Sequence, residues 1–251
     1  MRFGELHIYG KNAILETLRQ NPAMLVKLYV KDSVKNKEFE EIRTLATKHR
    51  IPINSVQEKK LDDMIGDVVN HQGVLALAKA FNYAELPAWL AENKDRATLS
   101  VVILDRIQDV QNFGAIVRSA AAFGMDAVIV GEHNQAPVTS AVFKTSAGAL
   151  LAIPIIQAGN INQLIETLKR EKFWLIGLDG RAEVSLANYQ QDARLGIVLG
   201  SEDDGIREKT REHCDTLVSI PISPAVESLN ASVSAAIACY ERAKFLGRTK
   251  N

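Results

Sequence analysis

An acidic loop bounded by two glycines follows a continuous apolar run in the C-terminal half of the chain. The run Leu195–Leu199 predicts a buried strand, and the loop after it reads Gly200-Ser201-Glu202-Asp203-Asp204-Gly205. In open α/β sheets, ligands bind beyond the carboxyl ends of strands, and glycine lets the backbone approach a ligand closely. The carboxylates disfavour a phosphate and suit a cation, or hydroxyl and amine donors. An ordinary turn, with acids favoured by the dipole of the next helix, would carry the same residues.

A helix near the middle of the chain carries two further candidates. The segment Phe113–Phe123 has helical spacing, and Asn112 stands where an N-cap is expected. Arg118 falls nearly opposite the apolar stripe of this helix, so we expect it to point toward the sheet edge or a partner chain. A solvated arginine on a surface helix is the alternative interpretation.

The third group lies in the segment Ile220–Ile237, where a proline-marked loop leads into a helix rich in small residues. Ser228 is expected to cap this helix, and Asn230 follows two positions later. Small residues let a ligand or another backbone approach closely. A tightly packed C-terminal helix would show the same composition.

Strands and helices alternate along the whole chain, which predicts an α/β fold. We expect a small α/β domain over residues 1–80, a polar linker over residues 81–98 and a second domain over residues 99–251. The apolar run Val101–Leu104 is typical of a parallel strand that is covered on both faces. The second domain is therefore expected to contain a parallel sheet.

The composition and the absence of certain motifs argue against several classes of protein and site. Lys plus Arg and Asp plus Glu both number 30, so there is no general basic surplus of the kind that phosphate binding favours. Two cysteines without a C-x-x-C pair predict no metal site and suit a reducing cytoplasm. No apolar run is long enough for a membrane span. No G-x-G-x-x-G follows a predicted strand, which disfavours a dinucleotide oxidoreductase.

Three motifs occur in a specific order: N-F-G-A-I-V-R-S-A-A-A-F-G from Asn112, L-G-S-E-D-D-G-I from Leu199, and I-P-I-S-P-A-V-E-S-L-N-A-S-V-S-A-A-I from Ile220. Together they resemble the SpoU branch of the SPOUT methyltransferases. The resemblance implies a C-terminal α/β trefoil-knot domain and a homodimer with cofactor pockets near the subunit interface. The segments from Ile8 and from His71 resemble that group's smaller, L30e-like α/β substrate-binding domain.

The resemblance implies that S-adenosyl-L-methionine is the cofactor and that the product is an RNA methylated at a ribose 2′-oxygen. It assigns the binding of the cofactor's adenosine part to backbone groups of Leu199, Gly200, Ile220, Ile222 and Leu229, with Leu178 lining the cleft. Ser228 and Asn230 would supply polar contacts near the methyl group, and Glu202 would orient Arg118 or the RNA. Asn112 belongs to the same catalytic set.

Arg118 is the general base that the family resemblance implies. A guanidinium is effectively always protonated in proteins, so Arg118 could instead stabilise the developing alkoxide or clamp the adjacent phosphate. Both interpretations place Arg118 at the reacting hydroxyl.

The substrate expected from the resemblance is a guanosine of 23S rRNA. Lys11 and Lys35 are candidate phosphate contacts, and an ordinary surface lysine is the alternative interpretation of each. A tRNA ribose methyltransferase and a non-enzymatic RNA-binding protein on the same scaffold are the alternatives. Three residues depart from the motifs of the family that the chain resembles. Asp203 and Pro224 occupy positions where that family frequently has glycine, and Val110 occupies a position where it frequently has proline. They leave substrate choice and loop geometry open more than the type of reaction.

Overall fold

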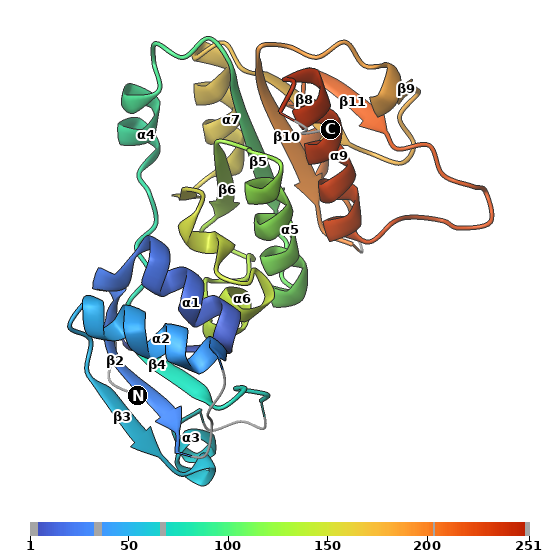
Figure 1. Cartoon of the computed structure of the whole chain (residues 1–251). Coiled ribbons are helices and arrows are strands. Elements are labelled where there is room, and N and C mark those ends of the chain that lie inside the picture. Colours follow the sequence, from blue (N-terminus) through green and yellow to red (C-terminus); the bar gives the residue numbers. More distant parts are fainter. Residues whose placement is uncertain (1–4, 33–36, 66–68, 203, 249–251) are drawn as a thin grey trace. The chain divides into compact units, whose positions relative to one another are not determined.

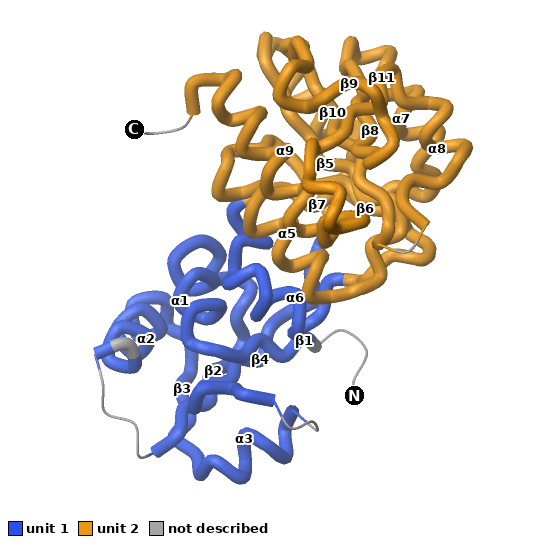
Figure 2. The backbone as a smooth tube through the Cα atoms, turned by 90° about the vertical axis from the view of Figure 1, so that its right-hand side faces the viewer, with its two compact units in different colours: residues 1–82, 138–152 blue, residues 83–137, 153–251 orange. Residues whose placement is uncertain are grey.

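The computed structural model describes residues 5–32, 37–65, 69–202 and 204–248 (Figure 1). The chain divides into two compact units, one of residues 1–82 with 138–152 and one of residues 83–137 with 153–251 (Figure 2). Among the described residues, no helix is both long and apolar enough to cross a lipid bilayer.

The first unit has a mixed sheet covered by short helices. Its described strands follow the order β1-β4-β2-β3, in which β2 and β3 are parallel and the other pairs are antiparallel. The elements are β1 (Glu5–Tyr9), α1 (Lys11–Gln20), η1 (Pro22–Met24), β2 (Leu25–Lys31), α2 (Lys37–Lys48), β3 (Ile53–Val56), α3 (Glu58–Ile65), β4 (Val74–Lys79), α6 (Ser140–Thr145) and η2 (Ala149–Leu151).

The segment 138–152 packs tightly within this first unit. Phe143 is fully buried, and its ring meets Phe81 edge to face with the centroids 6.1 Å apart. A Cβ on Gly148 would lie 2.6 Å from the Cβ of Glu16, and Gly148 has a φ of 85°. The left-handed backbone at Gly148 therefore separates α6 from η2.

The second unit is built on a parallel sheet. Within the described residues its strand order is β7-β6-β5-β10-β8-β11-β9, and neighbouring strands run parallel, as the apolar runs predict. The elements are α4 (Leu86–Glu92), β5 (Leu99–Asp105), α5 (Val110–Ala122), β6 (Ala127–Gly131), β7 (Ile155–Ala158), α7 (Ile161–Arg170), β8 (Trp174–Leu178), β9 (Val184–Ser185), η3 (Leu186–Asn188), β10 (Arg194–Gly200), α8 (Glu208–Glu212), β11 (Thr216–Ser219) and α9 (Ala231–Phe245).

The last helix, α9, packs beside α5 and is fixed near its end by a buried arginine. Arg242 has no exposed surface, and its Nε donates to Ser100 Oγ at 2.7 Å. Its two Nη atoms donate to main-chain carbonyls, among them Asp192 O at 2.6 Å and Ala193 O at 2.7 Å. The buried guanidinium thus has acceptors for its Nε and for both Nη groups, as a buried arginine requires.

Two helix starts differ from the sequence prediction. Helix α5 begins at Val110, because Asp109 is the N-cap and its Oδ1 accepts from Gln111 N at 2.8 Å. Asn112 therefore lies in the first turn and is buried. Helix α9 begins at Ala231 with Asn230 as its N-cap, so the assignment of that position to Ser228 is wrong.

Candidate functional site

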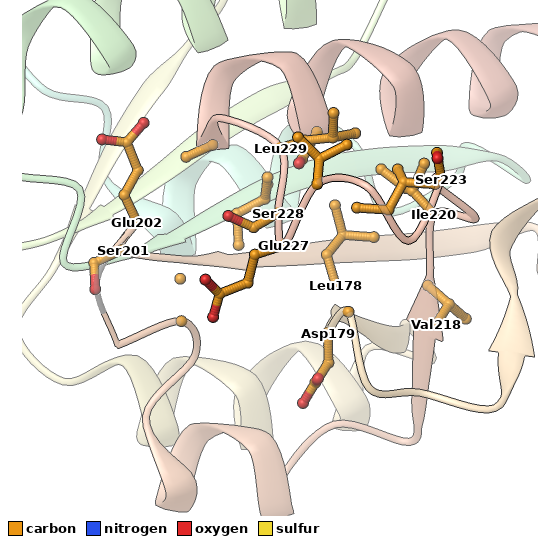
Figure 3. A pocket seen from close by; sticks show the side chains of 18 of the residues that line it. Leu178, Asp179, Ser201, Glu202, Val218, Ile220, Ser223, Glu227, Ser228 and Leu229 are labelled. Atoms are coloured by element: carbon orange, nitrogen blue, oxygen red, sulfur yellow. The ribbon is translucent and has the colours of Figure 1, made fainter.

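A cavity of about 320 Å³ lies beyond the carboxyl ends of three adjacent strands. Strands β10, β8 and β11 are neighbours in the sheet and end at Gly200, Leu178 and Ser219. Figure 3 shows the side chains that line the cavity, which come from these strand ends and from the loop that leads into α9. This is the position where open parallel sheets bind their ligands.

Gly200 has no room for a side chain, because the acidic loop folds back over it. A Cβ at this position would lie 1.9 Å from the carbonyl carbon of Gly205 and 2.1 Å from Ile206 N. Gly205 N donates to Ser201 O at 3.0 Å, and Gly205 has a φ of 67°. The glycine at each end of the loop is thus required for a tight turn, which forms one wall of the cavity.

The cavity combines apolar walls with negative charge. The described residues that line it include three carboxylates, those of Asp179, Glu202 and Glu227, and no lysine or arginine. The apolar part of the lining is formed by Leu178, Leu199, Val218, Ile220, Ile222, Val226 and Leu229.

This lining fits S-adenosylmethionine. The apolar walls match the adenine ring, and the carboxylates match a cofactor that carries a sulfonium and an ammonium group. A triphosphate would meet three like charges and no cation in the same lining.

Most of the residues expected from the sequence meet here. Eight of them line the cavity: Leu178, Leu199, Gly200, Glu202, Ile220, Ile222, Ser228 and Leu229. Sequence reasoning missed Asp179 and Glu227. The strand-end rule could have found Asp179, because it directly follows the apolar strand β8.

Asn230 connects the three motifs at the edge of the cavity. Its Nδ2 donates to Asn112 Oδ1 at 2.9 Å and also to Glu202 Oε1. Its Oδ1 accepts from Ser232 N at 2.9 Å and from Val233 N at 3.3 Å, which caps α9. One side chain thus fixes the end of α9, the first turn of α5 and the acidic loop relative to one another.

Arg118 is the expected residue that the fold does not bring to this cluster. It lies six positions after Asn112 in α5, which places it on another face of the helix and about 9 Å farther along the axis. Its side chain is exposed and lines neither the cavity nor the cluster at Asn230. Within one chain, Glu202 bonds to Asn230 and not to Arg118.

The candidate RNA contacts of the first unit stay predictions. Lys11 lines a separate polar cavity of about 380 Å³ with His71 and Gln72. Its Nζ lies 5.2 Å from the centroid of the Phe39 ring, and its main-chain N donates to Gln72 Oε1 at 2.9 Å. Lys35 and the unusual Asp203 lie outside the described residues.

Comparison with known proteins matches both parts of the chain. The SpoU rRNA Methylase family pattern matches residues 100–240, and the pattern for RNA 2′-O ribose methyltransferase substrate binding matches residues 7–84.

Individual relatives and a solved structure cover nearly the whole chain. The 23S rRNA (guanosine-2′-O-)-methyltransferase RlmB of Xanthomonas campestris is 38% identical over 93% of this chain and 94% of its own. A protein of Staphylococcus saprophyticus named as a candidate TrmH family tRNA/rRNA methyltransferase is 35% identical over 94% of each chain. The crystal structure of the SpoU methyltransferase AviRb from Streptomyces viridochromogenes, in complex with AdoMet, has a TM-score of 0.80 at 21% identity and covers 99% of this chain and 93% of its own.

These matches, together with the strand-end cavity and the cluster of the three motifs around Asn230, lead to one conclusion. The chain belongs to the SpoU rRNA methylase family of S-adenosylmethionine-dependent RNA ribose 2′-O-methyltransferases.

Proposed function

We propose that the protein methylates the ribose 2′-oxygen of a guanosine in 23S rRNA, in the cytoplasm. The observation that carries the proposal is the acidic, apolar-walled cavity whose edge holds Asn112, Glu202 and Asn230. When bound, S-adenosylmethionine supplies an electrophilic methyl group. In the transfer an O–C bond would form, the cofactor's C–S bond would break, and the proton of the 2′-hydroxyl would pass to a base or to water.

In this proposal the residues of the cavity bind the cofactor and orient its methyl group toward the acceptor. Backbone groups at Leu199, Gly200, Ile220, Ile222 and Leu229 hold the adenosine part, beside the Leu178 side chain. In this proposal Ser228 and the amide of Asn230 supply polar contacts near the transferred methyl group and the acceptor hydroxyl. Because Asn230 is bonded at both ends, its amide is held rigidly, which is the kind of preorganisation that stabilises a developing charge.

A homodimer completes this proposal. Since Arg118 is exposed and does not line the cavity of its own chain, we propose that it acts on the acceptor hydroxyl at the cavity of a second copy. Helix α9 supports such an interface, because Val233 and Tyr240 are 45% and 44% exposed and lie seven positions apart, on one face. Arg118 would then act either as the base or as an electrostatic clamp. We also propose that the C-terminal domain forms the trefoil knot of the family.

Mixing two inactive variants tests the shared site. Arg118→Ala and Asn230→Ala would each be inactive as homodimers. If Arg118 acts on the partner's cavity, a refolded equal mixture contains heterodimers with one intact site and recovers about a quarter of the wild-type activity. No recovery in a mixture that forms dimers would show that Arg118 does not act across the interface.

The substrate is tested by mapping ribose methylation in RNA from cells with and without the protein. We expect one 23S rRNA guanosine to lose its methyl group in the deletion strain, and the purified protein to restore it in vitro. Methylation of purified tRNA instead would favour the tRNA alternative. Absence of calorimetric binding to S-adenosylmethionine would favour the non-enzymatic alternative.

A further inference from the structure

A second cavity of about 280 Å³ opens beside the cofactor cavity. Ser201 and Glu202 line both, so the two cavities meet at the acidic loop, and Asn112 of the motif cluster also lines the second. Ligand pockets span roughly 300 to 1,000 Å³; this space lies just below that range and suits one small planar group better than a whole nucleotide. A nucleotide whose ribose lay at Asn112 and Glu202 would have its base within reach of this cavity.

The second cavity differs from the first in its charge. Its described lining carries one cation, the guanidinium of Arg106, next to carboxylates that include Asp109 and Asp204, whereas the first carries carboxylates alone. Arg106 Nη1 lies 3.4 Å from Asp204 Oδ2. Adjacent cationic donors and anionic acceptors are the complement of guanine, whose O6 and N7 accept and whose N1 and N2 groups donate hydrogen bonds. Adenine offers a donor where guanine has O6.

Arg106 is held in an unusual conformation at this cavity. Its φ is 66°, a left-handed value that is uncommon for a residue with a side chain and is often found at functional sites. The next residue fixes it there, because Ile107 N donates to Gln135 Oε1 at 2.9 Å and Ile107 O accepts from Ala136 N at 2.9 Å.

The Arg106 side chain has unused donor capacity. Its Nε is buried and makes no hydrogen bond within the described part of the protein. Its ion-pair partner Asp204 has a side chain that is 69% exposed. The donors left for a ligand in the second cavity are therefore those of the guanidinium's Nη end, which is loosely paired, with Nη1 3.4 Å from Asp204 Oδ2.

We propose that the second cavity receives the base of the methyl-acceptor nucleotide and selects guanine. Arg106 donates to O6 and N7, and the carboxylate of Asp204 accepts from N1 and N2. This inference rests on the proposed function and adds to it the residues that distinguish the base. It places base selection in the methyltransferase domain, next to the transferred methyl group.

The test uses short RNAs that contain the ribose mapped in the deletion strain, made with guanosine, 7-deazaguanosine or inosine at that position. The readout is the single-turnover rate at saturating S-adenosylmethionine. 7-Deazaguanosine lacks the N7 acceptor, and inosine lacks the N2 amino group. The variants are Arg106→Gln, Arg106→Lys and Asp204→Asn. Arg170→Gln is the matched control, because Arg170 is an exposed arginine that lines neither cavity.

We expect Arg106→Gln to slow methylation of the guanosine RNA about 10-fold to 100-fold, the usual value of an arginine–guanine contact. The wild type should lose rate on 7-deazaguanosine, whereas Arg106→Gln should show little further loss. Asp204→Asn should likewise discriminate little between guanosine and inosine. Arg106→Lys, which keeps the charge without the fork, should also lose discrimination. Melting temperature and S-adenosylmethionine affinity should match the wild type in all variants.

The inference would be overturned if Arg106→Gln slowed methylation of the guanosine RNA and of the 7-deazaguanosine RNA by the same factor relative to the wild-type protein. It would also be overturned if all three variants methylated every RNA at the rate of the wild-type protein. In both results the protein still methylates RNA, so the proposed function stands. If the wild type methylates none of the RNAs and leaves ribosomal RNA unchanged, the proposed function fails and this inference fails with it.

Discussion

The buried carboxylate of Asp105 holds Arg207, which lies 102 positions later in the chain. Asp105 Oδ1 accepts from Arg207 Nε at 2.8 Å, and Oδ2 accepts from Arg207 N at 3.1 Å. Asp105 ends β5, and Arg207 follows the acidic loop that bears Glu202. The Asp105 side chain has no exposed surface, whereas that of Arg207 is 44% exposed. The pair therefore fixes the far end of the loop to the centre of the sheet.

Asp105→Asn should release the far end of the acidic loop and lower the stability of the fold only moderately. We expect a loss of about 1 to 3 kcal/mol of unfolding free energy, because the exposed guanidinium can be hydrated after the carboxylate is gone. S-adenosylmethionine should bind more weakly, as calorimetry would measure. Arg207→Lys keeps the charge and should have a smaller effect. Unchanged cofactor affinity in Asp105→Asn would show that the pair does not position the loop.

Gly200→Ala should disrupt the strand-end cavity that we propose to bind the cofactor. The added methyl group overlaps the backbone at Gly205 and Ile206, so the loop must move by more than an ångström. A displacement of that size at a reacting centre can reduce the rate about 100-fold. Gly131→Ala is the control, since Gly131 also ends a parallel strand and a Cβ there would meet its nearest neighbour at 3.6 Å. Equal methylation rates in the two variants would contradict the close packing at Gly200.

Substitutions of Asn230 should separate its role as the N-cap of α9 from its role as a hydrogen-bond donor to Asn112 and Glu202. Asn230→Ser keeps a capping oxygen for α9, whereas Asn230→Ala removes it at a cost of about 1 kcal/mol of unfolding free energy. Neither variant retains the amide that donates to Asn112 and Glu202. Both should therefore lose about 100-fold in single-turnover rate, and urea unfolding should separate them in stability. A serine variant with normal rates would reduce Asn230 to a helix cap.

The two thiols should make the stability fall at alkaline pH. Burial raises the pKa of Cys239 from 9.0 to about 12, and burial likewise raises the pKa of Cys214 to about 12. Since the folded value is above the unfolded one, the stabilisation is complete below pH 9 and is lost as the pH rises from there toward 12.

Urea unfolding at about pH 8 and about pH 10.5 checks this expectation. The loss of unfolding free energy should be smaller in Cys239→Ala than in the wild type. Iodoacetamide should leave Cys239 unmodified in the folded protein and modify it in urea, because the thiolate is the reactive form. Rapid alkylation of folded Cys239 would contradict its burial.

Sequence patterns predicted that a ligand site would lie at the end of the Leu195–Leu199 strand, and the structure has a cavity there, although the same patterns also fit an ordinary turn. An apolar run such as Leu195–Leu199 predicts a covered parallel strand, and a glycine after it predicts a close backbone approach. The structure has β10 at this run and the cavity at its end. The proposed roles of the individual residues in catalysis stay predictions.

Helix caps could not be chosen from the sequence, because several capping residues stand close together. Asp109 and Asn112 compete at the start of α5, as Ser228 and Asn230 do at the start of α9. The choice depends on which side chain the tertiary structure frees for the helix end. The left-handed backbone of Arg106 could not be predicted from the sequence either. It depends on the contacts that Ile107 makes with residues distant in the chain.

The association of residues 138–152 with the first unit also has a consequence for how such proteins can be cut and recombined. The backbone passes between the units three times, at residues 82–83, 137–138 and 152–153. A fragment that starts after the linker would carry Phe143 without the partners that bury it, and its apolar surface would invite aggregation. A chimaera that exchanges the first unit between relatives must therefore also exchange residues 138–152. A single crossover near residue 82 would combine residues 1–82 of one protein with residues 138–152 of another, and the two segments would not be matched for packing.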